Sequence, residues 1–141
     1  MRYLIPFLFC CLILTSTDML QAQTKPAATG KPKAELYYFH PSERCPIDQS
    51  IEEITRKLMQ TDFGKPIREG TLKFQVINTD DPANEKIVKR FIINAQALFL
   101  VTFPGGKEKQ NDLTEFAFST AHSNPGKFRT VLKQDVLDAL K

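Results

Sequence analysis

The sequence predicts an α/β domain with one mixed four-stranded sheet, helices on both faces and the element order βαβαββα(α). Three observations support this three-layer arrangement. Short apolar runs alternate with segments of helical periodicity from residue 34 onward. The first two strands are separated by a helix, and such crossovers join parallel strands. Only Pro104-Gly105-Gly106 separates the last two strands, which is typical of a hairpin.

The N-terminal segment has the pattern of a signal peptide. A positive start at Met1-Arg2 precedes an uncharged apolar run over 3–14, and the small residue Ala22 suits cleavage. The run is shorter than the roughly 20 residues that cross a bilayer. We therefore expect a signal peptide over 1–22 and an exported, periplasmic protein; a buried N-terminal helix or an uncleaved anchor is the alternative.

The rest of the 141-residue chain predicts a leader and one domain. Residues 23–33 are rich in Lys, Pro, Ala, Thr and Gly, with few apolar side chains to bury, and predict a flexible leader. The domain then covers 34–141. The net charge is only +3 and no stripe of Lys and Arg is present, so neither nucleic-acid binding nor an electrostatic membrane role is expected. No stable membrane span is expected in the mature form.

Four strands and their helices are predicted from the pattern. Glu35–Phe39 is a buried run, while the segment from Thr71 to Asn78 alternates as a half-buried strand does. The most continuous apolar strand, Ala97–Phe103, is expected at the centre of the sheet and the polar Lys107–Asn111 at an edge. Helices are expected from Cys45 to about Thr61 (ended by Gly64-Lys65-Pro66), after Asp80-Asp81-Pro82, over Leu113–His122 and at the C-terminus.

The start of the first helix carries the candidate site. Pro46 fits the first helical position, because its missing N–H would have no partner there. Asp48, at the third position, can accept a backbone N–H and face the positive end of the helix dipole. Cys10 and Cys11 leave with the signal peptide, so Cys45 is the one cysteine of the expected mature chain, and no internal disulfide can form.

A Cys-Pro pair between the first strand and the first helix resembles the thioredoxin superfamily. Tyr37-Tyr38-Phe39 followed by Cys45-Pro46-Ile47-Asp48 resembles its first strand and Cys-x-x-Cys motif, and Ala97–Gly106 resembles its third strand and turn. Arg44-Cys45-Pro46 and Asn78–Pro82 are similar to an exported thioredoxin-like family found mainly in Bacteroidetes. Its members are often named after a nitrophenyl-compound nitroreductase subunit and are associated with arsenical resistance. The resemblance implies thiol chemistry with a disulfide or protein partner and no cofactor.

Two positions depart from the superfamily pattern. Asp48 stands where the resolving cysteine would be, which disfavours two-cysteine oxidoreductase activity. Ala97 stands where the superfamily has a cis-proline, and a cis bond before a non-proline residue costs about 2.5–4 kcal/mol, so we expect a trans bond.

The resulting hypothesis is a single-thiol protein, and two alternatives stay open. Cys45 is the candidate nucleophile, Pro46 shapes the helix start, and Arg44 and Asp48 respectively favour and oppose the thiolate. In the first alternative, a non-enzymatic interaction module, an exposed apolar surface near Tyr37, Pro46 and Ala97 holds a partner. In the second, the protein carries a metal or metalloid on Cys45.

The metal alternative has a weak basis in the spacing. His40, Cys45, Asp48 and His122 are suitable ligand types, but their spacing matches no zinc pattern, so no resident metal site is predicted.

Overall fold

The computed structural model describes residues 30–141. The predicted signal peptide, most of the predicted leader, Cys10 and Cys11 lie outside the described residues.

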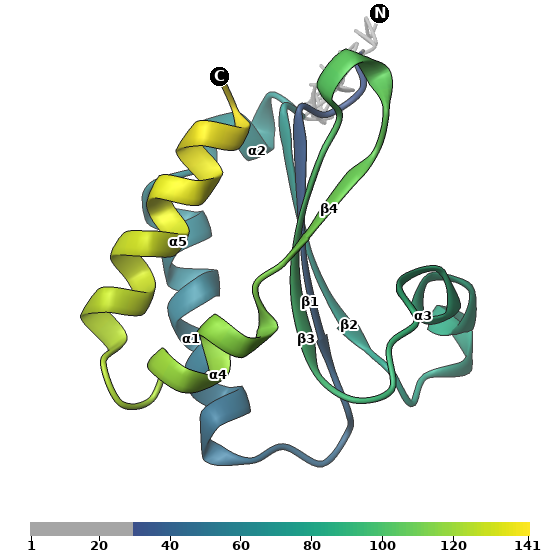
Figure 1. The fold of residues 1–141 in the computed structure, drawn as a ribbon, viewed down its shortest axis with the longest axis vertical. Helices are drawn as coiled ribbons and strands as arrows, with labels where there is room; N and C mark the ends of the chain where they lie inside the picture. Colours follow the sequence, from purple (N-terminus) through teal and green to yellow (C-terminus); the bar gives the residue numbers. More distant parts are fainter. Residues whose placement is uncertain (1–29) are drawn as a thin grey trace, which may run out of the picture.

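Four strands form one mixed sheet in the order β2-β1-β3-β4 (Figure 1). The strands are β1 (Ala34–His40), β2 (Leu72–Asn78), β3 (Ala97–Thr102) and β4 (Lys109–Asp112). β1 pairs parallel with β2 and antiparallel with β3, which pairs antiparallel with β4. The mixed α/β sheet, its central third strand and its polar edge strand are confirmed.

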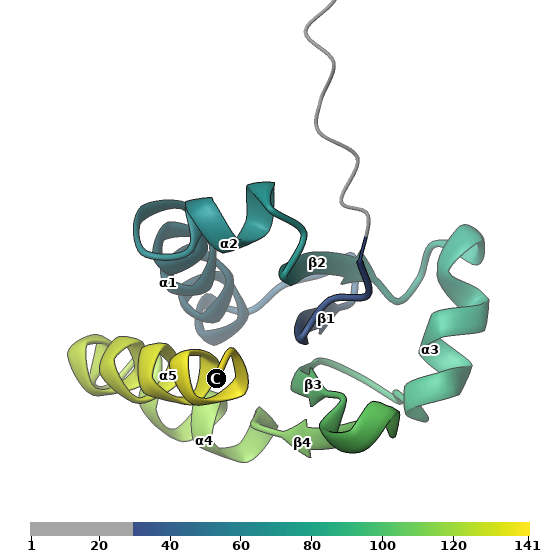
Figure 2. The ribbon, with the colours of Figure 1, turned by 90° about the horizontal axis from the view of Figure 1, so that it is seen from above.

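Helices lie on both faces of the sheet (Figure 2). One face carries α1 (Pro46–Thr61), α2 (Gly64–Arg68), α4 (Thr114–Thr120) and α5 (Pro125–Ala139). The other carries α3 (Glu85–Phe91), which follows the 3-10 turn η1 (Pro82–Asn84); a second 3-10 turn, η2 (Pro104–Gly106), joins β3 to β4. Within residues 30–141, no helix is both long and apolar enough to cross a membrane.

The predicted order was wrong in one element. Gly64-Lys65-Pro66 was expected only to end the first helix, yet it begins the short helix α2. Pro66 lies in the first turn of α2, where a residue without an N–H removes no intrahelical hydrogen bond. Phe63, at the N-cap of α2, is buried in the core and anchors this turn.

The sheet divides the buried side chains into two cores. On the α1 side, Tyr38 and Leu36 of β1 pack with apolar residues of α1, α4 and α5. On the α3 side, Tyr37 and Phe39 pack around Phe91, whose ring centroid lies 5.0 Å from that of Tyr37 and 5.2 Å from that of Phe39. Because side chains alternate along a strand, β1 contributes side chains to both cores. This packing holds the end of β1 in place, and the candidate site begins there.

Candidate functional site

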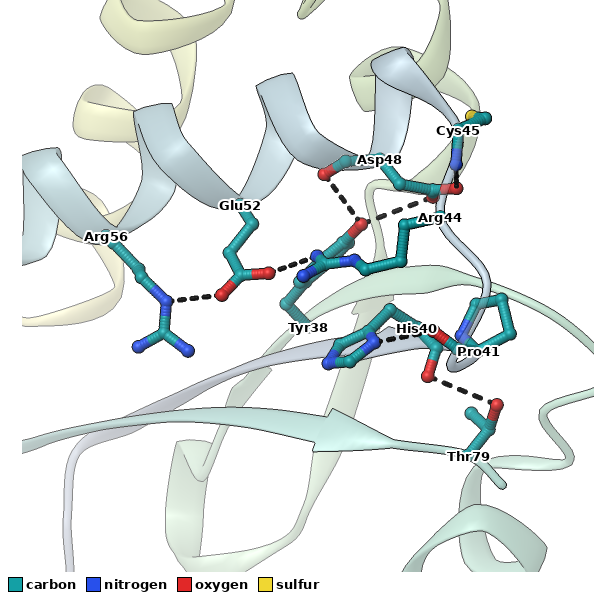
Figure 3. Close-up of polar contacts among 9 residues, drawn as sticks. All are labelled: Tyr38, His40, Pro41, Arg44, Cys45, Asp48, Glu52, Arg56 and Thr79. Carbon is teal, nitrogen blue, oxygen red and sulfur yellow. Dashed lines mark hydrogen bonds and ion pairs between the residues drawn. The ribbon is translucent and has the colours of Figure 1, made fainter. Parts of the chain in front are cut away.

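Cys45 lies at the N-cap of α1, beyond the end of β1 at the carboxyl edge of the strand (Figure 3). Its side chain is exposed, and it is the one free cysteine within residues 30–141. Backbone N–H groups of the first helical turn and the helix dipole favour an anion at this position. The predicted placement of Cys45 at the start of a helix is confirmed.

Asp48 is buried beneath the first turn of α1, where it holds the helix start in place. It is 2% exposed, and its Oδ2 accepts the backbone N–H of Cys45 at 3.2 Å. The hydroxyl of Tyr38 lies 3.3 Å from Asp48 Oδ1 and donates to the Asp48 backbone carbonyl oxygen at 3.0 Å. Pro46 occupies the first helical position, as predicted. The carboxylate therefore caps the helix and ties it to β1.

Arg44 points away from the thiol, into the space between α1 and β1 (Figure 3). Its guanidinium forms an ion pair with Glu52 and lies over the ring of Tyr38, 5.8 Å from the centroid. Among the described residues, no hydrogen bond or ion pair joins it to Cys45. Arg44 was predicted to favour the thiolate directly; the structure places it in the support beneath the helix.

Glu52 connects two arginines within this support. It pairs with Arg44 and, through Oε1, with Nε of Arg56 at 2.5 Å. Burial raises the pKa of Glu52, but the hydrogen bonds and charges of Arg56 and Arg44 outweigh burial and hold that pKa below its ordinary value. Burial also raises the pKa of Tyr38 well above its ordinary value, so the hydroxyl stays a donor to Asp48. The polar groups under α1 are thus fixed as a charged and hydrogen-bonded set.

The two histidines considered as metal ligands contact other groups. Nδ1 of His40 lies 2.8 Å from the carbonyl oxygen of Pro41, and Nδ1 of His122 lies 3.3 Å from Ser50 Oγ. Within residues 30–141, no three His, Cys, Asp or Glu side chains are grouped as metal ligands would be.

The apolar docking surface expected near Tyr37, Pro46 and Ala97 is not present. Tyr37 is 3% exposed and Ala97 6%, because α3 covers this part of the sheet and both side chains join the core beneath it. Pro46 alone of the three is exposed. The peptide bond before Ala97 is trans, as expected.

A second polar group was missed by sequence reasoning. Glu35, in β1, is 7% exposed; its carboxylate accepts the hydroxyl of Tyr37 at 2.5 Å and pairs with Nζ of Lys73 at 3.2 Å. It lines a cavity of about 420 Å³ beside the ion pair of Arg90 and Glu108. The available signal was the alternation itself, which places Glu35 on the same face as Tyr37; the pairing with Lys73 follows only from the register of β1 with β2.

This second group makes stability sensitive to alkaline pH. Burial, followed by the hydrogen bond to Glu35, raises the pKa of Tyr37 to about 12. Because that value exceeds the ordinary value of 10.0, the stability contributed by Tyr37 is fully present below pH 10 and lost as the pH rises to about 12. We expect the urea midpoint to fall over this window, and to fall less in Tyr37→Phe. Equal pH dependence of the two proteins would contradict the assignment.

Comparison of the sequence with protein-family models and with curated proteins finds no match.

Proposed function

We propose that the protein is an exported, thioredoxin-like, single-thiol protein that forms mixed disulfides through Cys45. The observation that carries the proposal is an exposed thiol at the N-cap of a 16-residue helix, with no second cysteine among the described residues. The partner is a protein or small molecule that bears a disulfide. The α/β fold and the resemblance around Cys45-Pro46 support the same class of chemistry.

The proposed step is one thiol–disulfide exchange. The Cys45 thiolate attacks one sulfur of a disulfide R–S–S–R′; the S–S bond of the substrate breaks as a bond from Sγ to one substrate sulfur forms. The other sulfur leaves as a thiolate and takes up a proton from water. Cys45 and the leaving sulfur exchange oxidation state, so electrons balance without a cofactor.

The surrounding residues act as positioning residues in this proposal. Pro46 and Asp48 fix the first turn of α1, so that its N–H groups lie near the sulfur. Because Asp48 occupies the position of a resolving thiol, the adduct persists until an external thiol attacks it. This distinguishes the protein from a two-cysteine reductase, which releases its substrate by closing an internal disulfide.

The test is reaction with glutathione disulfide. In a background with Cys10 and Cys11 replaced by Ser, we expect the folded protein to gain one glutathionyl group, located at Cys45 by peptide mapping and removed by dithiothreitol. Cys45→Ser, a near-isosteric control, should gain none at that position. Because the thiol is exposed at the N-cap of α1, the folded protein should react without denaturant. A thiol that reacts only after unfolding would contradict the proposal and favour the interaction module.

A further inference from the structure

The two edges of the sheet differ in how they are protected. β4 is four residues long, fully exposed and polar, and it follows η2; short, charged edge strands of this kind resist pairing. β2, the opposite edge, is seven residues long and contains no proline, and its one charged residue is Lys73. Figure 2 shows α2 and α3 on either side of the sheet plane and no described strand beyond β2.

Along this edge, the outward backbone groups of Phe74 and Val76 have no partner among residues 30–141. The carbonyl of Thr71 accepts N–H groups from the start of β1, and the N–H of Thr79 donates to the carbonyl of His40, so odd-numbered residues of this segment face β1. Backbone groups of successive strand residues point to opposite sides. The N–H and C=O of Phe74 and Val76 therefore point away from β1, toward the open edge.

The side chains of β2 are complementary to a second copy of β2. In the antiparallel register that overlaps the whole strand, Gln75 lies opposite Gln75 of the second copy, Phe74 opposite Val76 and Lys73 opposite Ile77. The two Phe74–Val76 pairs each exchange both backbone hydrogen bonds, and aromatic–β-branched pairs are favourable across strands. No like charges face each other.

We propose that two copies of this chain associate through β2, giving a continuous eight-stranded sheet with a two-fold axis at Gln75. Such an interface is isologous, since each strand pairs with its own copy and the assembly closes as a dimer. Phe74 and Val76 are half-buried and pack against the α1-side core, so the dimer extends this core across the axis. The inference is independent of Cys45, because that residue lies outside β2.

A cysteine placed at the axis tests both the dimer and its register. In a background with Cys10, Cys11 and Cys45 replaced by Ser, Gln75→Cys places two thiols in a non-hydrogen-bonded pair with Cα atoms about 4.5 Å apart, within disulfide reach. Lys73→Cys, two residues away on the same face, leaves the two thiols about 14 Å apart. We expect an oxidised dimer on a non-reducing gel for Gln75→Cys only. Equal cross-linking of both variants, or of neither, would overturn the proposal.

A proline on the edge gives an independent readout. Val76→Pro removes an N–H that points outward and leaves the pairing of β2 with β1 intact, so the chain keeps its fold. By analytical ultracentrifugation, with circular dichroism to check the fold, we expect wild type to dimerise as concentration rises and folded Val76→Pro to remain monomeric. A wild type that is monomeric at every concentration, or a folded Val76→Pro that dimerises as wild type does, would overturn the inference.

Discussion

Replacement of Glu52 by Ala is expected to lower the free energy of unfolding by about 3 kcal/mol, because it leaves the arginine beneath α1 without its counter-ion. The side chain of Arg44 is 23% exposed and that of Glu52 15%. Nε of Arg44 is already buried without a hydrogen-bond partner among the described residues. The ion pair with Glu52 therefore offsets most of the cost of burying the guanidinium charge. Loss of one partner from such a pair costs more than the pair itself contributes.

The neighbouring residue provides a matched control. Glu53 is exposed on the same helix and takes part in no ion pair of residues 30–141, so Glu53→Ala should change stability by less than about 0.5 kcal/mol. Urea unfolding of both variants measures the difference. The double variant Arg44→Met, Glu52→Met should recover most of the loss, since it removes the charge and its counter-ion together. Equal stability of the two single alanine variants would show that solvent compensates Arg44.

The strands and the start of α1 could be predicted because local rules determine them. A strand that is buried on both faces has a continuous apolar run, as in Glu35–Phe39, and a strand that is buried on one face alternates, as in Leu72–Asn78. The cap at Asp48 follows from its position three residues after Cys45. Each of these signals lies within a few consecutive residues. The α/β class followed from their order along the chain.

The errors concern side chains whose direction is decided by distant elements. Arg44 was expected beside the thiol, but Glu52 lies two turns along α1 and draws the guanidinium inward. The alternative of an interaction module placed an exposed apolar surface near Tyr37 and Ala97, but α3 covers both residues, and nothing near either residue indicates how far that helix reaches. Glu35 was unremarked because its partner Lys73 is 38 residues away and becomes a neighbour only through the parallel register.

Asp48→Cys is expected to convert this single-thiol protein into one that cycles between dithiol and disulfide. Position 48 lies in the first turn of α1, three residues after Cys45 and beneath the exposed start of the helix. The hydroxyl of Tyr38 keeps an acceptor in the variant, since its shorter hydrogen bond goes to the backbone carbonyl of residue 48 and the longer one to the carboxylate. The substitution therefore removes a capping carboxylate, a loss of about 1 kcal/mol, without leaving Tyr38 unpaired.

Once both thiols are present, a mixed disulfide at Cys45 can be attacked from within the chain. The introduced thiolate forms a bond to Cys45 Sγ, the bond from Sγ to the substrate sulfur breaks, and the substrate leaves as a thiol after taking up a proton. We expect the variant to release glutathione without any added thiol, as an internal disulfide forms between residues 45 and 48, whereas wild type retains the glutathionyl group until dithiothreitol removes it. Cys45→Ser combined with Asp48→Cys controls for reaction at the introduced thiol alone. An Asp48→Cys protein that folds, reacts at Cys45 and still fails to release glutathione would mean that the first turn of α1 holds the two sulfurs apart, and the comparison with a Cys-x-x-Cys site would no longer describe this helix start.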